Sequence, residues 1–131
     1  MSLILVKNLS KSYVDGDSVL NVLSNVNMEL NEGEIIIING PSGSGKTTLL
    51  NIISTLDSPD NGEIIIQDNL INFDDSNQID NVRSKTIGIL FQNHYLIDEL
   101  TILENITLPY KLNSIENHQN PISLLKEFNL E

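Results

Sequence analysis

The 131-residue sequence has no cysteine, and this absence excludes disulfide bonds and thiolate chemistry. Positive charge is scarce too, since 7 lysines and arginines stand against 18 aspartates and glutamates, giving a net charge of −11. A basic stripe for a nucleic-acid backbone is therefore missing, and adhesion to an anionic lipid leaflet is disfavoured. The 2 histidines, His94 and His118, have no partner at metal-site spacing and are expected in solvated loops.

Long apolar runs are also missing, because no stretch approaches the roughly 20 residues that a membrane-spanning helix needs. The first residues lack the basic segment and the length of a signal peptide. We therefore expect a cytoplasmic chain without direct membrane insertion. Its length allows one domain with a real core, but it is short for a complete doubly wound nucleotide-binding sheet.

The sequence does contain a glycine-rich stretch over residues 40–48, GPSGSGKTT, which fits the phosphate-loop pattern of Gly, four residues and Gly-Lys-Ser/Thr. Its glycines let the backbone curl so that successive N–H groups point inward at phosphate oxygens. The helix N-terminus that follows favours an anion, and the Lys46 ammonium reaches the β- and γ-phosphates. Thr47 offers a hydroxyl for magnesium. The candidate nucleotide-binding residues are Gly40, Ser42, Gly43, Ser44, Gly45, Lys46, Thr47 and Thr48.

The segments on either side of the loop support this interpretation. Residues 35–38 are consecutive isoleucines, which predict a buried central strand. Apolar residues then recur at helical spacing and predict an amphipathic helix that begins near Lys46 and includes Leu49, Leu50, Ile52, Ile53 and Leu56. A glycine-rich turn that matches by chance is the alternative, but a strand before and a helix after are the context that the motif requires. The chain binds a nucleoside triphosphate, or descends from one that did.

Several other segments have strand or loop patterns. A hairpin is expected at Asp15-Gly16, between a strand over residues 3–6 and an alternating strand over residues 26–30. The remaining expected segments are short strands at residues 63–67 and 70–73, a surface loop at residues 74–77, and a second buried strand at residues 87–91 that ends at Gln92.

Two helices are expected in the last part of the chain. Thr101 and Glu104 form a capping-box pattern that opens a short helix, and Pro109 is expected to end it. Another helix is expected from Pro121, because apolar residues after it share one face.

Three further motifs, together with the phosphate loop, resemble those of the ATP-binding cassette (ABC) ATPases that drive membrane transporters. They are KSY at residues 11–13, LDSPDNGEI at residues 56–64 and IGILFQ at residues 87–92. The run LTILENITLP at residues 100–109 is most similar to the lipoprotein-release and macrolide-efflux group of exporters. The resemblance implies an α/β fold, with a P-loop NTPase core, an N-terminal antiparallel β subdomain and the start of a helical subdomain.

The resemblance also implies roles for two residues outside the loop. Tyr13 is similar to the aromatic residue that stacks on adenine, and Gln92 to the Q-loop glutamine that flanks magnesium with Thr47 and senses the partner. From the residues alone, Tyr13 is better explained as an ordinary sheet aromatic, and Gln92 is equally well explained as a polar residue at a strand end. The implied ligands are ATP and Mg²⁺. The implied partners are a transmembrane permease subunit, which holds the protein at the inner face of the membrane, and a second nucleotide-binding domain.

Members of this family continue with a Leu-Ser-Gly-Gly-Gln signature, a Walker B strand ending in Asp-Glu that supplies the catalytic base, and a switch histidine. None of these occurs here. The resemblance therefore implies that residues 1–131 are a single nucleotide-binding domain truncated before the signature, inactive alone although the family hydrolyses ATP. Thr55 stands where glycine is frequent in the family.

Two other functions remain open from the sequence. A non-catalytic nucleotide-binding module is one of them. A small nucleotide kinase is the other, because guanylate-kinase-like proteins also use a Gly-Pro-Ser-Gly phosphate loop. Such kinases normally start close to that loop, however, and no arginine-rich acceptor site follows here, where Arg83 is the only arginine.

Overall fold

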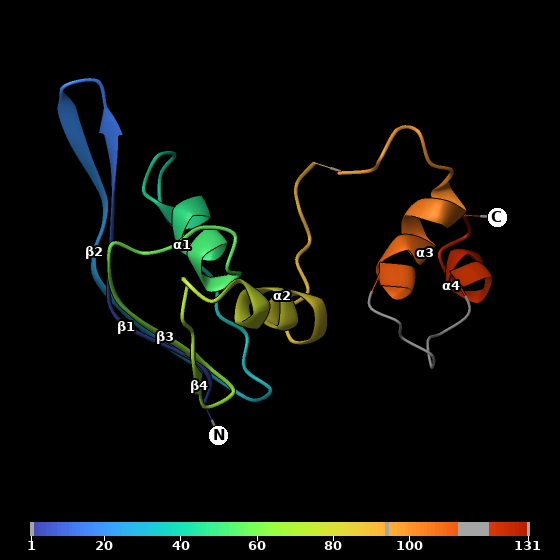
Figure 1. Ribbon diagram of the computed structural model, residues 1–131, viewed down its shortest axis with the longest axis horizontal. Helices are drawn as coiled ribbons and strands as arrows, with labels where there is room; N and C mark the ends of the chain where they lie inside the picture. The colour runs from blue at the N-terminus through green and yellow to red at the C-terminus, as the bar shows by residue number, and fades with distance from the viewer. Residues whose placement is uncertain (1, 94, 113–120, 131) are drawn as a thin grey trace. The chain divides into compact units, whose positions relative to one another are not determined.

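The computed structural model describes residues 2–93, 95–112 and 121–130, which Figure 1 traces from blue to red. His94 and His118 lie outside the described residues, so their positions stay predictions. The chain divides into two compact units, Met1–Ile87 and Gly88–Glu131. The elements in order are β1 (Ser2–Asp15), β2 (Ser18–Asn31), α1 (Lys46–Ile53), β3 (Asn61–Ile66), β4 (Asn69–Leu70) and α2 (Ser76–Lys85) in the first unit, then α3 (Ile102–Leu112) and α4 (Pro121–Glu127) in the second.

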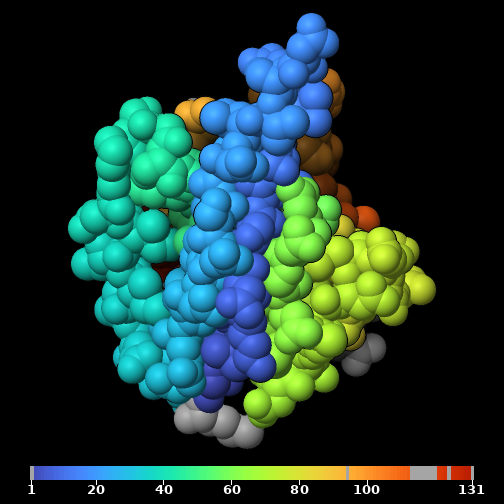
Figure 2. Space-filling view, turned by 90° about the vertical axis from the view of Figure 1, so that its left-hand side faces the viewer, coloured from blue at the N-terminus to red at the C-terminus, as the bar shows by residue number. Residues whose placement is uncertain are grey.

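The first unit is built on a four-stranded antiparallel sheet in the order β2-β1-β3-β4. Figure 2 shows β2, β1 and β3 side by side as light blue, dark blue and green bands. β1 and β2 form a long hairpin in which Asp15 pairs with Ser18, so the predicted reversal at this point is confirmed. Val6 lies in the middle of the sheet, opposite Met28 of β2 and Ile64 of β3.

Both strands of the hairpin contain bulges. In β1 the register shifts between Val6 and Leu9, and Asn8 has a φ of 49°. In β2 Asn25 has a φ of 50°, and asparagine adopts this left-handed conformation more easily than most residues. The Asn27 side chain joins the two sites, because its Oδ1 accepts a hydrogen bond from the Asn8 N–H and its Nδ2 donates one to the Asn25 carbonyl, both at 2.9 Å. The bulges are therefore fixed by side-chain contacts.

Apolar side chains from the sheet, α1 and α2 form the core of the first unit. The buried ones are Val6, Leu9, Leu23, Leu49, Ile52, Ile53, Ile64, Ile66, Ile71, Ile79 and Val82. The predicted amphipathic helix is thus confirmed at Leu49, Ile52 and Ile53. The predictions for Leu50 and Leu56 are wrong, since these side chains are exposed.

The helix α2 begins at Ser76, so the surface loop predicted for residues 74–77 is confirmed for Asp74 and Asp75 and wrong for Ser76 and Asn77. The Asp75 carboxylate caps α2 by accepting hydrogen bonds from the N–H groups of Asn77 and Gln78, both at 3.1 Å. The Gln78 side chain returns to the preceding segment, where its Oε1 accepts a hydrogen bond from the Asn72 N–H at 2.7 Å. The polar residues that suggest a loop therefore start a helix, because they satisfy its first backbone donors.

Neither residues 35–38 nor residues 87–91 form a strand in the described part of the chain, so both predictions of a buried strand are wrong. Ile35 and Ile37 are 89% and 77% exposed, and Leu90 is 99% exposed. An apolar run becomes a buried strand only where neighbouring strands pair with its backbone and helices cover its faces. The four strands of the sheet pair only among themselves and leave both runs without such neighbours.

The second unit contains the two helices expected there. The capping box is confirmed, because the Thr101 N–H and hydroxyl donate to the Glu104 carboxylate at 2.9 and 2.7 Å, and the Glu104 N–H donates to Thr101 Oγ1 at 3.3 Å. α3 continues through Pro109 to Leu112, so the predicted end is wrong; a proline removes one backbone donor and weakens a helix without always ending it. α4 begins at Pro121 as predicted.

Within residues 2–93, 95–112 and 121–130, no helix is both long enough and apolar enough to cross a bilayer.

Candidate functional site

The predicted phosphate loop lies directly before α1, where Figure 1 shows the chain turning into the first helix. Its shape depends on Gly43 and Gly45, whose φ angles are 80° and 85°. A residue with a Cβ is strained in this conformation. Space is also limiting at Gly45, because an added Cβ would lie 2.9 Å from the Val22 carbonyl oxygen of β2. The loop therefore requires glycine at both positions.

Lys46 is the first residue of α1, and its side chain folds back over the loop. Its Nζ donates hydrogen bonds to the carbonyl oxygens of Gly40 at 2.9 Å and Pro41 at 2.6 Å, and to Ser44 Oγ at 3.3 Å. These contacts hold a positive charge at the mouth of the loop. They are exposed, so phosphate oxygens can compete for the ammonium and gain charge-assisted hydrogen bonds from it.

A hollow of about 600 Å³ opens beside the loop, within the usual range for small-molecule sites. Within the described residues, α1 has neither a side-chain cap nor an acidic residue in its first turn. The first N–H groups of a helix have no intrahelical partner, and with the positive end of the dipole they favour an anion. These features fit the phosphate groups of a nucleotide. The predicted residues that line the hollow are Ser42, Gly43, Ser44, Gly45, Lys46, Thr47 and Thr48, with Val22 beside them.

Tyr13 lies near the end of β1 and is 39% exposed. Its hydroxyl donates a hydrogen bond to Asp57 Oδ2 at 2.7 Å. This bond, and to a lesser extent desolvation, raises the pKa of Tyr13 above its ordinary value, while the nearby Thr48 side chain opposes the rise. Tyr13 is thus bonded to the segment after α1 and lies near a residue that lines the hollow.

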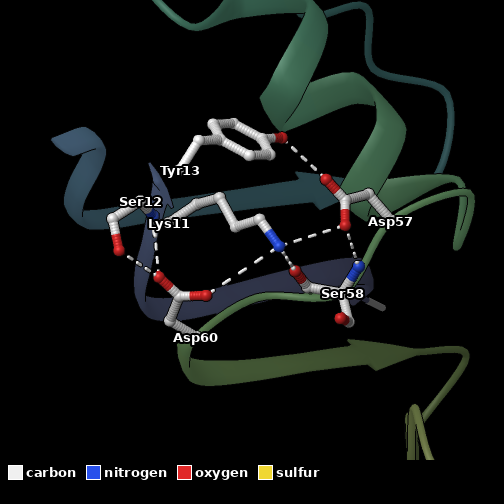
Figure 3. Close-up of polar contacts among 6 residues, drawn as sticks. All are labelled: Lys11, Ser12, Tyr13, Asp57, Ser58 and Asp60. Atoms are coloured by element: carbon white, nitrogen blue, oxygen red, sulfur yellow. Dashed lines mark hydrogen bonds and ion pairs between the residues drawn. The ribbon is translucent and has the colours of Figure 1, made fainter. Parts of the chain in front are cut away.

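Figure 3 shows the group to which Tyr13 belongs, which we call the Lys11 cluster. Lys11 is its centre, with a side chain only 11% exposed. Its Nζ lies 3.1 Å from Asp57 Oδ1 and 3.8 Å from Asp60 Oδ1, and donates a hydrogen bond to the Ser58 carbonyl oxygen at 2.6 Å. The members of the cluster are Lys11, Ser12, Tyr13, Asp57, Ser58 and Asp60.

The carboxylates of the Lys11 cluster are held in their charged forms. Partial burial acts to raise the pKa of Asp57, but hydrogen bonds from Tyr13, Lys11 and the Ser58 N–H outweigh it and lower that pKa. Asp60 accepts hydrogen bonds from the Ser12 hydroxyl at 2.6 Å and N–H at 2.7 Å, and these lower the pKa of Asp60. The cluster therefore joins the end of β1 to the segment that follows α1 through charge-assisted contacts.

Comparison with known protein families gives a match to the ABC transporter family over residues 23–131. The chain belongs to the ABC transporter family. It is 37% identical to the lipoprotein-releasing system ATP-binding protein LolD of Buchnera aphidicola, over 100% of this chain and 60% of that protein. It is 45% identical to the uncharacterized ABC transporter ATP-binding protein MJ0796 of Methanocaldococcus jannaschii, over 82% of this chain and 46% of that protein.

The fold agrees with this membership. The dimeric structure of a post-hydrolysis state of the ATP-binding cassette MJ0796, bound to ADP and Pi, has a TM-score of 0.85 and 38% sequence identity. It covers 98% of this chain, which in turn covers 58% of that structure. The resemblance to ABC ATPases and the fold class predicted from the sequence are confirmed. The chain spans about half the length of the relatives it matches, between 46% and 60% for LolD of Buchnera aphidicola and MJ0796.

Magnesium contacts are expected in this family from Thr47 and Gln92. Thr47 lines the hollow, whereas Gln92 belongs to the second unit, where it is exposed in a segment without helix or strand. Both magnesium roles stay predictions. No group of three or more His, Asp or Glu residues that could hold a metal ion occurs in the described ranges. Magnesium in nucleotide sites usually takes only one or two protein ligands, with phosphate and water oxygens as the rest.

The sequence interpretation missed the Lys11 cluster. Two of the motifs that resemble the family, residues 11–13 and 56–64, supply all six of its members. The lysine in the first motif and the two aspartates in the second are a charge pattern that could have suggested the contact. Nothing in the sequence, however, specifies that Tyr13 rather than a neighbour contacts Asp57, 44 residues away.

Proposed function

We propose that this chain binds magnesium ATP as the N-terminal part of the nucleotide-binding domain of an ABC transporter. The observation that carries the proposal is the phosphate loop, where a glycine-dependent cradle, an uncapped helix start and the Lys46 ammonium surround one hollow. Membership of the ABC transporter family and the naming of relatives as ATP-binding proteins support it. In this proposal residues 1–131 form one domain that lacks the signature and the Walker B strand.

Each part of the nucleotide has a proposed contact. Lys46 and the loop amides hold the β- and γ-phosphates, and the Thr47 hydroxyl and Gln92 hold magnesium, which neutralises phosphate charge. The ring of Tyr13 stacks on adenine, where its flat face provides affinity with little selectivity between bases. The influence of Thr48 on the pKa of Tyr13 supports this assignment, because Thr48 lines the hollow and the phenol therefore lies near it.

The complete protein is proposed to work in a larger assembly. A second nucleotide-binding domain would pair with it, as the dimeric structure of the cassette MJ0796 suggests. A transmembrane permease would use the ATPase cycle for transport and would hold the protein at the cytoplasmic face of the membrane. The similarity to LolD proteins favours a system of the lipoprotein-release type.

The chain itself is proposed to bind ATP without hydrolysing it. Hydrolysis requires a carboxylate or similar group that orients or deprotonates water in line with the γ-phosphate. Among the described residues, Asp57 and Asp60 are engaged by Lys11 and Ser12, and Asp75 caps α2. These three carboxylates are engaged in other contacts, and we propose that the catalytic carboxylate belongs to the Walker B strand of the family's domain, which residues 1–131 do not include.

Isothermal titration calorimetry with magnesium ATP tests the proposal. In Lys46→Ala the phosphates lose an ammonium contact worth roughly 1.5–3 kcal/mol, so the dissociation constant should rise by about 10- to 150-fold. Lys85→Ala is the matched control, because it removes the same charge from the exposed end of α2. Equal binding by wild type and Lys46→Ala, or no binding by wild type, would contradict the proposal.

A further inference from the structure

We propose that Asp57 is a positioning residue for the nucleobase, because its carboxylate fixes the hydroxyl of Tyr13 and thereby the plane of the ring that stacks on adenine. This inference rests on the proposed function, since it assumes that ATP binds at the phosphate loop. It assigns a binding role to a residue of the segment after α1 that contacts the nucleotide only through Tyr13.

The first support is the geometry of the Asp57 carboxylate, whose two oxygens have different partners. Oδ2 accepts the hydrogen bond from the Tyr13 hydroxyl at 2.7 Å. Oδ1 accepts hydrogen bonds from Lys11 Nζ at 3.1 Å and from the Ser58 N–H at 2.7 Å. A carboxylate held on one oxygen by a cation and a backbone donor has a fixed orientation, so the other oxygen presents a fixed acceptor to the phenol.

The second support is the position of Lys11 relative to the ring. Lys11 Nζ lies 5.2 Å from the centroid of the Tyr13 ring, within the range of a cation–π contact. Figure 3 shows the Lys11 side chain running along one side of the ring toward Asp57. One ring face is therefore occupied, and a base can stack only on the other face. A tyrosine on a strand end that is 39% exposed would otherwise rotate freely about its side-chain bonds, and stacking would then cost rotational entropy.

The third support is the place of Asp57 in the chain. α1 begins with Lys46, at the proposed phosphate site, and Asp57 follows the same helix after its C-terminal turn. The Asp57 N–H is bonded to the Asn51 carbonyl at 3.3 Å, which keeps this residue against the helix. The phosphate contact thus lies at the first residue of α1, and the anchor of the stacking ring lies in the segment that is hydrogen-bonded to the end of the same helix, so α1 separates the two ends of the nucleotide site.

The experiment compares two probes on the full 131-residue chain, magnesium ATP and magnesium tripolyphosphate, which has the phosphates but no base. Wild type, Tyr13→Phe, Asp57→Ala and the double variant are titrated with each probe. Tyr13→Phe and Asp57→Ala should each weaken ATP binding by about three- to tenfold, the range expected for a misplaced aromatic contact, and should leave tripolyphosphate binding unchanged. The double variant should be no weaker than either single variant, because both changes break the same hydrogen bond.

Asp80→Ala is the control for charge, because it removes an exposed carboxylate of α2 in the same unit and should leave both probes unaffected. A spectroscopic readout follows from the same bond, since the tyrosinate absorbance of Tyr13 should titrate at lower pH in Asp57→Ala. ATP binding by Tyr13→Phe equal to that of wild type would overturn the proposal. So would additive losses in the double variant, or a parallel loss of tripolyphosphate binding in Asp57→Ala, which would show a structural effect. Failure of wild type to bind either probe would instead refute the proposed function.

Discussion

Replacing Thr55 by glycine should stabilise the protein, because threonine occupies a position whose backbone conformation suits glycine. α1 ends in a Schellman motif, in which the Leu56 N–H donates to the Asn51 carbonyl at 2.8 Å and the Thr55 N–H to the Ile52 carbonyl at 3.0 Å. This motif places Thr55 in the left-handed conformation, with a φ of 61°. The side chain is buried, 5% exposed, and its Oγ1 has no hydrogen-bond partner among the described residues.

The magnitude follows from four contributions. Relief of the left-handed strain should stabilise the folded state by about 1–2 kcal/mol. Removal of a buried hydroxyl without a partner should contribute about 1–3 kcal/mol. The loss of the two buried side-chain carbons costs about 1.6 kcal/mol, and the greater flexibility of glycine in the unfolded chain costs about 0.5–1 kcal/mol. We therefore expect a net gain of about 1 kcal/mol for Thr55→Gly.

Urea denaturation followed by far-UV circular dichroism measures this gain as a higher midpoint at unchanged slope. Thr55→Ala separates the contributions, because it removes the hydroxyl but keeps the Cβ that is strained at this φ. It should be less stable than Thr55→Gly and more stable than Thr55→Ser, which keeps the hydroxyl. A midpoint for Thr55→Gly at or below that of wild type would refute the reasoning, because either the strain or the unpaired hydroxyl would then be without energetic consequence.

Four other predictions follow from the structure. Asp75→Ala should lower the free energy of unfolding by about 1 kcal/mol, because α2 loses its N-cap; an unchanged urea midpoint would contradict this. The folded pKa of Asp57 lies below its ordinary value of 3.8. The contribution of the Asp57 carboxylate to stability is therefore present above pH 3.8 and is lost as the pH falls through the folded pKa. The urea midpoints of wild type and Asp57→Asn should accordingly converge in acid. Purified chain should release phosphate from ATP no faster than Lys46→Ala, and turnover of roughly 1 s⁻¹ or more would show that these residues contain a catalytic base and would contradict the prediction. The exposed isoleucines at residues 35–37 should bind a hydrophobic dye and promote self-association, whereas a monodisperse, dye-free monomer with a sharp melt would show that this surface is harmless.

Features of the fold that depend on neighbouring residues were predictable from the sequence. The phosphate loop, the hairpin at Asp15 and the capping box of Thr101 and Glu104 all arise from contacts within a few residues, and the structure contains each of them. Few other residue types can replace the glycines, because left-handed turns favour glycine. The ligand is constrained too, because an uncapped helix start favours an anion.

Features that depend on distant partners were not predictable. The isoleucines at residues 35–38 have the composition of a central strand, yet composition does not supply the strands that must pair with them. The start of α2 is an exception, because it was missed although the contacts of Asp75 and Gln78 are local; its few apolar residues and polar start resemble a loop. The Lys11 cluster joins segments more than 40 residues apart, and the bond between Tyr13 and Asp57, at a separation of 44, depends on how β1 and α1 pack.

The bulge at Asn8 changes which side chains of β1 share a face. In a regular strand Val6 and Leu9 would point to opposite sides, but both are buried in the same core, because the extra residue shifts the alternation by one position. Lys11 and Tyr13 follow Leu9 at intervals of two residues. The extra residue at the bulge thus changes which of the later side chains of β1 face the core. Deleting one residue between Val6 and Tyr13 would therefore alter the candidate nucleotide site even if Tyr13 itself were kept.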